Sequence, residues 1–155
     1  MIKRKEKTGD LIKVHFDEPY FTYAQYLTDT LFAFYDFKSV NDIQEICQVL
    51  DKMKLFTISV HASAVRSNRW KIVGSCELPE NSKENPPLFK NKIIAEAQPA
   101  AYAIYKYGIT RDATREECMG LEYLFAWTPE KVEERLRDHY AGRPNFQAEY
   151  YRIKD

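Results

Sequence analysis

The chain has 155 residues and no net formal charge, with 45% hydrophobic and 30% charged residues, which are ordinary values for a globular protein. This length fits one domain, residues 1–155. No apolar run approaches the roughly 18 residues that a membrane helix needs. The absence of net positive charge argues against nucleic acid as an obligate ligand, because such binding depends on phosphate neutralisation.

Three cysteines, Cys47, Cys76 and Cys118, lie far apart in the sequence and are odd in number. A secreted disulfide framework is therefore not expected, and we predict small buried side chains in a reducing cytosol. The N-terminal stretch MIKRKEKTGD is charged and has no hydrophobic segment behind it, unlike a signal peptide. These features together predict a cytoplasmic protein.

Charge is unevenly distributed along the chain. Residues 10–51 carry eight acidic and two basic side chains, a net of −6, and residues 52–71 carry five basic and no acidic side chains. Such a polarised surface can steer a charged protein partner. The alternative is that the two blocks neutralise each other within the fold.

Three short strands are predicted near the N-terminus. Gly9-Asp10 is a turn, residues 11–16 alternate between apolar and polar side chains, and residues 20–27 and 31–37 are rich in aromatic residues. Tight turns between these segments favour an antiparallel meander. Neither face of the third strand is clearly polar, which indicates cover on both sides, as in a strongly bent sheet or a small SH3-like barrel. The rings then form either a packed core or a ligand groove.

A helix is predicted to begin at Ser39, with apolar residues at Ile43, Ile46, Cys47 and Leu50. Residues 54–65 are typical of a strand, and residues 70–78 of its antiparallel partner. The polar, proline-bearing segment 79–92 is predicted to be a loop, and residues 101–109 another strand that Gly108 ends.

Residues 114–142 contain glutamates, a cysteine and a histidine, so we tested them as a metal or catalytic site. Thr114 and Glu117 fit a capping box that begins a helix running to Trp127. Thr128-Pro129 begins the next helix, on which Glu133 and Arg137 are spaced to pair, and Gly142 ends it. Close ligand pairs typical of zinc sites are missing from the sequence, so the pattern predicts a helix pair and no metal.

No catalytic motif occurs elsewhere. The five glycines form no phosphate-binding cluster, and none of the histidines, His15, His61 and His139, lies in a recognisable catalytic motif. We therefore expect a non-enzymatic protein without a cofactor. The predicted fold class is α+β: a strongly bent antiparallel sheet or small SH3-like barrel with one inserted helix and a C-terminal helix pair.

Several of these landmarks together resemble the immunity protein 26 family of bacterial polymorphic toxin systems. They are Gly9-Asp10, the aromatic strand around Tyr23, AFYD (33–36), WKIVG (70–74), EECMGLE (116–122), Trp127 and VEERLRDHY (132–140). The resemblance implies a cytosolic antitoxin without catalytic activity that binds and blocks a cognate toxin domain, often a nuclease.

A nuclease site attracts phosphate and so tends to be basic, which makes the acidic block a predicted contact surface. The candidate contacts are Asp17, Glu18, Asp29, Asp36, Asp42 and Glu45. The alternative for each is a solvated turn or cap residue. The alternative function is an aromatic small-barrel module that binds a peptide or a single-stranded nucleic acid.

Overall fold

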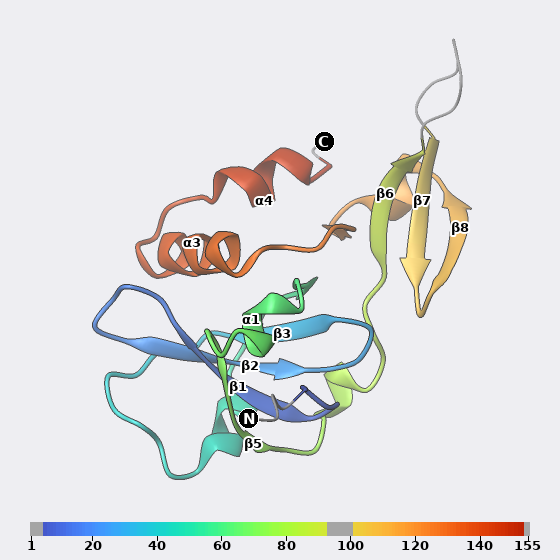
Figure 1. Ribbon diagram of the computed structural model, residues 1–155. Coiled ribbons are helices and arrows are strands. Elements are labelled where there is room, and N and C mark those ends of the chain that lie inside the picture. Colours follow the sequence, from blue (N-terminus) through green and yellow to red (C-terminus); the bar gives the residue numbers. More distant parts are fainter. Residues whose placement is uncertain (1–4, 93–100, 154–155) are drawn as a thin grey trace.

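The computed structural model describes residues 5–92 and 101–153, and it is an α+β fold with two sheets (Figure 1). The first sheet has five antiparallel strands in the order β4-β3-β2-β1-β5, and the second has four in the order β8-β7-β6-β9. The first sheet is bent but does not close into a barrel, so the bent-sheet form of the prediction is confirmed. Lys3 and Arg4 of the basic N-terminal stretch lie outside the described residues.

The predicted N-terminal meander is present. It consists of β1 (Asp10–His15), β2 (Phe21–Tyr26) and β3 (Leu31–Tyr35), each antiparallel to the next. Gly9 precedes β1 with a φ of 94°, a left-handed conformation that glycine adopts without a steric penalty. The local signals of alternation and turn residues were sufficient to locate these strands.

The pairing predicted for the next two strands is wrong. Strand β4 (Lys54–Ser59) pairs with β3, whereas β5 (Lys71–Ser75) pairs with β1 at the opposite edge of the sheet. The one-turn helix α1 (Ser63–Arg66) lies between them, in a segment predicted to be strand. Trp70 then enters the core with no exposed surface, so the chain crosses to the other edge instead of returning as a hairpin.

Both faces of the five-stranded sheet are covered, as the aromatic third strand predicted; all five residues of β3 are buried. On one face, Phe32, Phe34 and Trp70 form a core with Val132 and Leu136 of a C-terminal helix. Further core residues lie on the other face, among them Tyr23, Tyr35, Val49 and Leu88. The rings of β2 and β3 are therefore core residues rather than the lining of a ligand groove.

The helix predicted from Ser39 to Leu50 is absent. Ser39 forms an isolated antiparallel bridge with Phe21, with backbone N–H···O distances of 2.9 and 3.0 Å in the two directions. This bridge holds the chain extended where a helix would begin. Helical structure appears only at the three-ten helix η1 (Ile46–Asp51).

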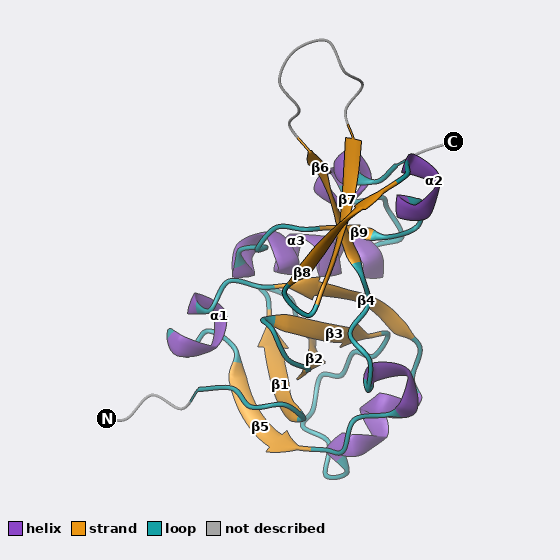
Figure 2. Ribbon diagram, turned by 90° about the vertical axis from the view of Figure 1, so that its right-hand side faces the viewer, coloured by secondary structure: helices purple, strands orange, loops and turns teal. Residues whose placement is uncertain are grey.

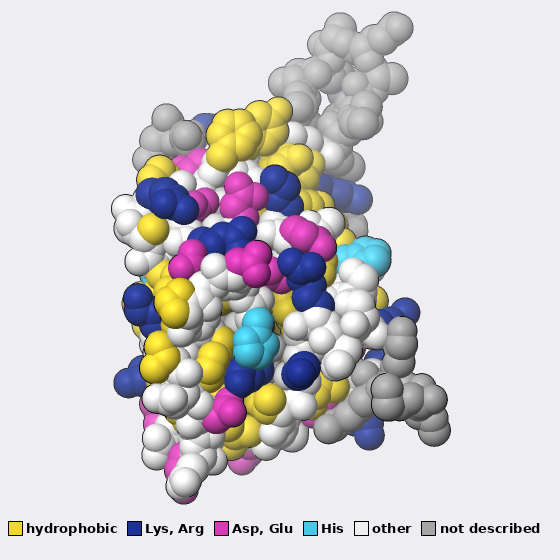
Figure 3. Space-filling model, turned by 60° about the vertical axis from the view of Figure 1, so that its left-hand side comes forward, with side chains coloured by type: hydrophobic (Ala, Val, Ile, Leu, Met, Phe, Trp, Pro, Cys, Tyr) yellow, Lys and Arg dark blue, Asp and Glu magenta, His cyan; other side chains and the backbone are white. Residues whose placement is uncertain are grey.

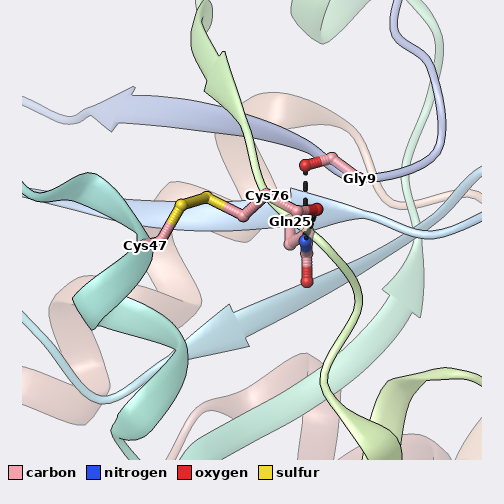
Figure 4. The surroundings of a disulfide bond; sticks show 4 residues. All are labelled: Gly9, Gln25, Cys47 and Cys76. Atoms are coloured by element: carbon pink, nitrogen blue, oxygen red, sulfur yellow. Dashed lines mark hydrogen bonds between the residues drawn. A yellow bond between two sulfur atoms is a disulfide. The ribbon is translucent and has the colours of Figure 1, made fainter.

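A disulfide joins Cys47 of η1 to Cys76, which follows β5 (Figure 4). The prediction that all three cysteines are unpaired is therefore wrong for these two, while Cys118 is a free, buried thiol as expected. Gln25 supports the Cys76 end, because its Nε2 donates to the Cys76 carbonyl at 3.0 Å and to that of Gly9 at 3.3 Å. The disulfide and Gln25 together attach the segment after β5 to both η1 and the meander.

The second sheet stands beside the first (Figure 2) and meets it at one end, where Leu88 of β6 and Tyr105 of β7 join the core under the first sheet. It contains β6 (Leu88–Lys92), β7 (Ala101–Lys106), β8 (Ile109–Ala113) and the short parallel strand β9 (Glu122–Tyr123). Tyr107 and Gly108, both at positive φ, turn β7 into β8, so Gly108 ends the strand as predicted. The predicted loop 79–92 instead contains the three-ten helix η2 (Glu80–Ser82) and β6.

The C-terminal region has helices α2 (Arg115–Cys118), α3 (Pro129–Tyr140) and α4 (Phe146–Tyr151). The capping box of Thr114 and Glu117 is confirmed, but α2 ends after one turn because the chain, with Gly120 at a φ of 82°, continues into β9. Helix α3 begins and ends as predicted, with Gly142 at a φ of 72°. The actual helix pair is therefore α3 and α4. Across residues 5–92 and 101–153, no helix combines the length and apolar character needed to cross a membrane.

The polar face of α3 also differs from the prediction. Glu133 does not pair with Arg137: it is 4% exposed and accepts hydrogen bonds from Arg69 and from the Trp70 indole. Arg135 is also buried, lies 3.8 Å from the Phe56 ring centre and forms two hydrogen bonds to Glu122. Charged side chains therefore help to hold α3 in place: Glu133 binds the segment before β5, and Arg135 binds β9 of the second sheet.

Candidate partner-binding surface

The six acidic residues proposed as contacts do not lie together. In the antiparallel meander, the turn between β1 and β2 and the connection between β3 and β4 are at one end of the sheet, and the turn between β2 and β3 is at the other. Three candidates share the first end, which we call the acidic end: Asp17, Glu18 and Asp36. Asp29 lies at the opposite end, where it accepts a hydrogen bond from Tyr105 of β7. Asp42 lies over the face of the sheet beside Lys13, and Glu45 precedes Ile46 and Cys47, which contact Gly74 and Cys76 near the start of β1.

Asp36 contacts a histidine. Its Oδ1 lies 3.0 Å from Nε2 of His139 near the end of α3, and both side chains are about two-fifths exposed. The neighbouring Tyr140 hydroxyl donates to the Phe37 carbonyl at 2.9 Å and accepts from the Phe37 amide at 3.1 Å. Burial raises the pKa of Tyr140, which therefore remains a neutral hydrogen-bonding group. These contacts fix the end of α3 against the acidic end.

The remaining candidate acids, Asp17, Glu18, Asp42 and Glu45, are also exposed to solvent. Asp42 accepts from Lys13 at 2.5 Å, although its own side chain is 79% exposed. The side chains of Asp17, Glu18 and Glu45 form no hydrogen bond or ion pair within the described part of the chain. Acidic and basic side chains are interspersed on the face shown in Figure 3. Within the −6 block itself, Lys13 pairs with Asp42, so the block is partly neutralised within the fold.

The histidines do not form a recognisable catalytic arrangement with these acids. His61 is exposed and contacts the Ser63 hydroxyl at 2.8 Å, and the His139–Asp36 pair lines none of the described pockets. Among the described residues, no group of three or more His, Cys, Asp or Glu side chains could hold a metal ion. Three glutamates of the 114–142 stretch have structural roles instead: Glu117 completes the capping box, Glu122 binds the buried Arg135, and the buried Glu133 binds the exposed Arg69.

The sequence did not predict a second exposed surface, which lies on α4. On α4, Phe146 is 81% and Tyr150 is 70% exposed, and their rings stack with centres 6.0 Å apart. Tyr150 continues the cluster to Tyr151, which stacks on Tyr123 at 4.7 Å. Figure 3 shows hydrophobic side chains gathered at the top of the molecule, where α4 lies. We call Phe146, Tyr150 and Tyr151 the α4 rings.

Several shallow grooves surround the α4 rings. One of about 560 Å³ is lined by Arg115, Phe146, Glu149, Tyr150 and Arg152, and another of about 460 Å³ includes Tyr102, Tyr123 and both Tyr150 and Tyr151. Two features of the sequence point to α4: Asn145 as a helix cap, and the aromatic residues Phe146 and Tyr150 four positions apart. In the structure, the Asn145 side chain accepts a hydrogen bond from the Ala148 amide at 2.9 Å. A six-residue helix is too short for this pattern to stand out from the polar segment around it.

The structure is that of a small α+β protein whose main surface features, an acidic end and a group of exposed rings, are ones that protein–protein contacts use. A family model described as Immunity protein 26 matches residues 7–114. This match covers more than half of the chain, and the protein belongs to that family. Comparisons with curated proteins and with solved structures find no match. The matched segment includes the acidic end but stops before the α4 rings.

Proposed function

We propose that this protein is the antitoxin of a bacterial polymorphic toxin system, and that it binds and blocks a cognate toxin domain in the cytoplasm. The observation that carries the proposal is the family match over residues 7–114. Inhibition is by stoichiometric binding and requires no catalysis or cofactor. The alternative, a small-barrel module with an aromatic groove, loses support because the rings of β2 and β3 lie in the core.

The contact surface we propose combines the acidic end with the α4 rings. A nuclease is a suitable class of target, because its substrate-binding site is basic to attract phosphate. Asp17 and Glu18 form no hydrogen bond or ion pair through their side chains within the described residues, and are therefore available to such a surface. Exposed rings and arginines are the residues that contribute most affinity at the centre of protein interfaces.

Charge reversal at the acidic end is the first test. The toxin domain encoded beside this gene is co-purified with the protein, and binding rates are measured for the double variant Asp17→Lys and Glu18→Lys. We expect an association rate about tenfold lower at low salt, with the difference shrinking at high salt, because exposed charges act mainly by steering. The double variant Glu80→Lys and Glu116→Lys, two exposed acids away from the acidic end, changes the net charge equally and is the matched control. Equal association rates for the two variants would remove the acidic end from the mechanism.

Removal of the α4 rings is the second test. The double variant Phe146→Ser and Tyr150→Ser is expected to bind the toxin domain at least about thirtyfold more weakly, because even one ring anchor at an interface contributes roughly 2 kcal/mol or more. Its free energy of unfolding should change by less than about 0.5 kcal/mol, since both rings are already exposed. Ile109→Ser is the control, a 72% exposed apolar residue on the second sheet. Wild-type affinity in the double variant would restrict the contact to the acidic end.

A further inference from the structure

A pocket of about 400 Å³ lies between strands β1 and β5 and the segment that leads into η1. Lys13 and Lys71 are direct cross-strand partners, and His15 is two residues along β1 on the same face. Like charges placed directly opposite each other on neighbouring strands are destabilising. The sheet thus contains a repulsive pair at the rim of a concave site.

The acidic residue nearby does not neutralise this rim. Asp42 pairs with Lys13, whose side chain is only 15% exposed and whose Nζ also lies 4.0 Å from the Phe21 ring centre. Lys71 and His15 have no ion pair within the described residues. The rim, made of Lys13, Lys71 and Asp42, therefore carries a net charge of about +1 with His15 neutral, and +2 with His15 protonated.

The remaining lining residues are mostly apolar: Tyr23, Ile43, Ile46 and Val73, with Gln44 beside them. This combination selects for an anion that also has an apolar part. We propose that this pocket, the Lys71 pocket, binds a carboxylate carried on a short apolar stem, with the carboxylate between Lys71 and His15 and the stem against Ile43 and Val73. A free short-chain carboxylic acid and a glutamate side chain of another protein share this chemistry.

His15 is a built-in reporter for this site. Burial lowers its pKa, Lys13 and Lys71 lower it further, and Asp42 opposes them by raising it. A carboxylate bound beside His15 stabilises the imidazolium form, so ligand binding must raise the pKa. His61 and His139 provide internal references in the same spectrum, since neither lines the pocket.

The test follows the imidazole resonances of the full chain by NMR over a pH series, with no ligand and with butyrate, butyramide, inorganic phosphate or a capped glutamate (N-acetyl-glutamate α-amide). We expect butyrate to raise the pKa of His15 alone and butyramide to leave it unchanged. A response to capped glutamate as well identifies a protein side chain as a ligand, whereas a response to butyrate alone identifies a free acid. No response to butyrate, or an equal response to butyramide, would overturn the proposal, and an equal response to phosphate would overturn the need for an apolar stem.

Lys71→Gln provides the second measurement. Lys71 is exposed, so the variant should fold normally, raise the pKa of His15 in the absence of ligand and weaken butyrate binding about threefold. Lys52→Gln, an exposed lysine of the same basic segment outside the pocket, should do neither. Unchanged butyrate binding in Lys71→Gln would overturn the assignment of Lys71. The inference does not depend on the antitoxin proposal, because the readout involves only this chain and small molecules.

Discussion

Reduction of the Cys47–Cys76 disulfide is expected to lower the melting temperature of the protein by about 6–16 °C. The bond joins residues separated by 29 positions, and closing a loop of that length stabilises the fold by roughly 3 to 4 kcal/mol through the entropy of the unfolded chain. For a domain of this size, each kcal/mol corresponds to about 2–4 °C. The bond therefore supplies a large part of a typical net stability.

The measurement is thermal unfolding followed by circular dichroism, with and without dithiothreitol. The double variant Cys47→Ser and Cys76→Ser should melt close to the reduced wild type and show no response to the reductant. Cys118→Ser retains the disulfide and should respond fully, because Cys118 is the free thiol. A wild-type melting temperature that dithiothreitol does not move would mean that the bond does not stabilise the fold.

The disulfide also bears on the argument about location. An odd number of widely spaced cysteines predicted a reducing compartment, but the fold brings two of them together from η1 and the end of β5. Nothing local in the sequence marks this pair, since the contact arises only when β5 pairs with β1. Disulfides are rare in the cytosol, so the Cys47–Cys76 bond weighs against inferring a reducing compartment from the number and spacing of the cysteines. The cytoplasmic location itself stays a prediction.

The parts of the fold that the sequence predicted well are those set by local interactions. The meander follows from alternation and turn residues between neighbouring segments. The limits of α3 follow from the Thr128 side chain, which accepts from the Lys131 amide at 3.3 Å, from proline at the first position and from Gly142. In each case the residues that determine the structure are within a few positions of one another.

The errors arise where a distant segment decides the conformation. Ser39 looked like a helix cap, but it pairs with Phe21 and its hydroxyl bonds to Asn41 instead. The order of β4 and β5 depends on which sheet edge is free, which periodicity does not reveal. Helix α2 was predicted to be too long, and α4 was not predicted at all. Helices of only 4 and 6 residues give little periodic signal in the sequence.

For the candidate contacts, the sequence indicated the charge but not its distribution in space. The alternating turns of the meander place Asp29 at the opposite end of the sheet from Asp17, Glu18 and Asp36, and Lys13 and His139 engage Asp42 and Asp36. The α4 rings were overlooked because the aromatic content of the chain was attributed to the core. Tyr150 is 70% exposed and Tyr23 is 1% exposed, and this difference depends on the folded structure.

Replacement of Glu133 by alanine is expected to lower the free energy of unfolding by about 3 kcal/mol. The Glu133 carboxylate is buried between α3 and the sheet, where it accepts from Arg69 Nε at 2.6 Å and Nη2 at 2.8 Å, and from Trp70 Nε1 at 3.0 Å. Its loss leaves the buried indole N–H without an acceptor, which costs roughly 1–3 kcal/mol. It also removes a bidentate charged pair, although Arg69, at 42% side-chain exposure, can turn towards water.

Two further variants separate these contributions, measured by urea denaturation with tryptophan fluorescence and circular dichroism. Glu133→Gln keeps an oxygen that can accept from Trp70 and should lose about half as much stability as Glu133→Ala. Glu130→Ala removes a carboxylate that lies 3.3 Å from the same guanidinium but is 64% exposed, so it should cost less than about 0.5 kcal/mol. A loss as small in Glu133→Ala as in Glu130→Ala would show that α3 is held on the sheet by its apolar residues, and that the Trp70 indole finds another acceptor when Glu133 is removed.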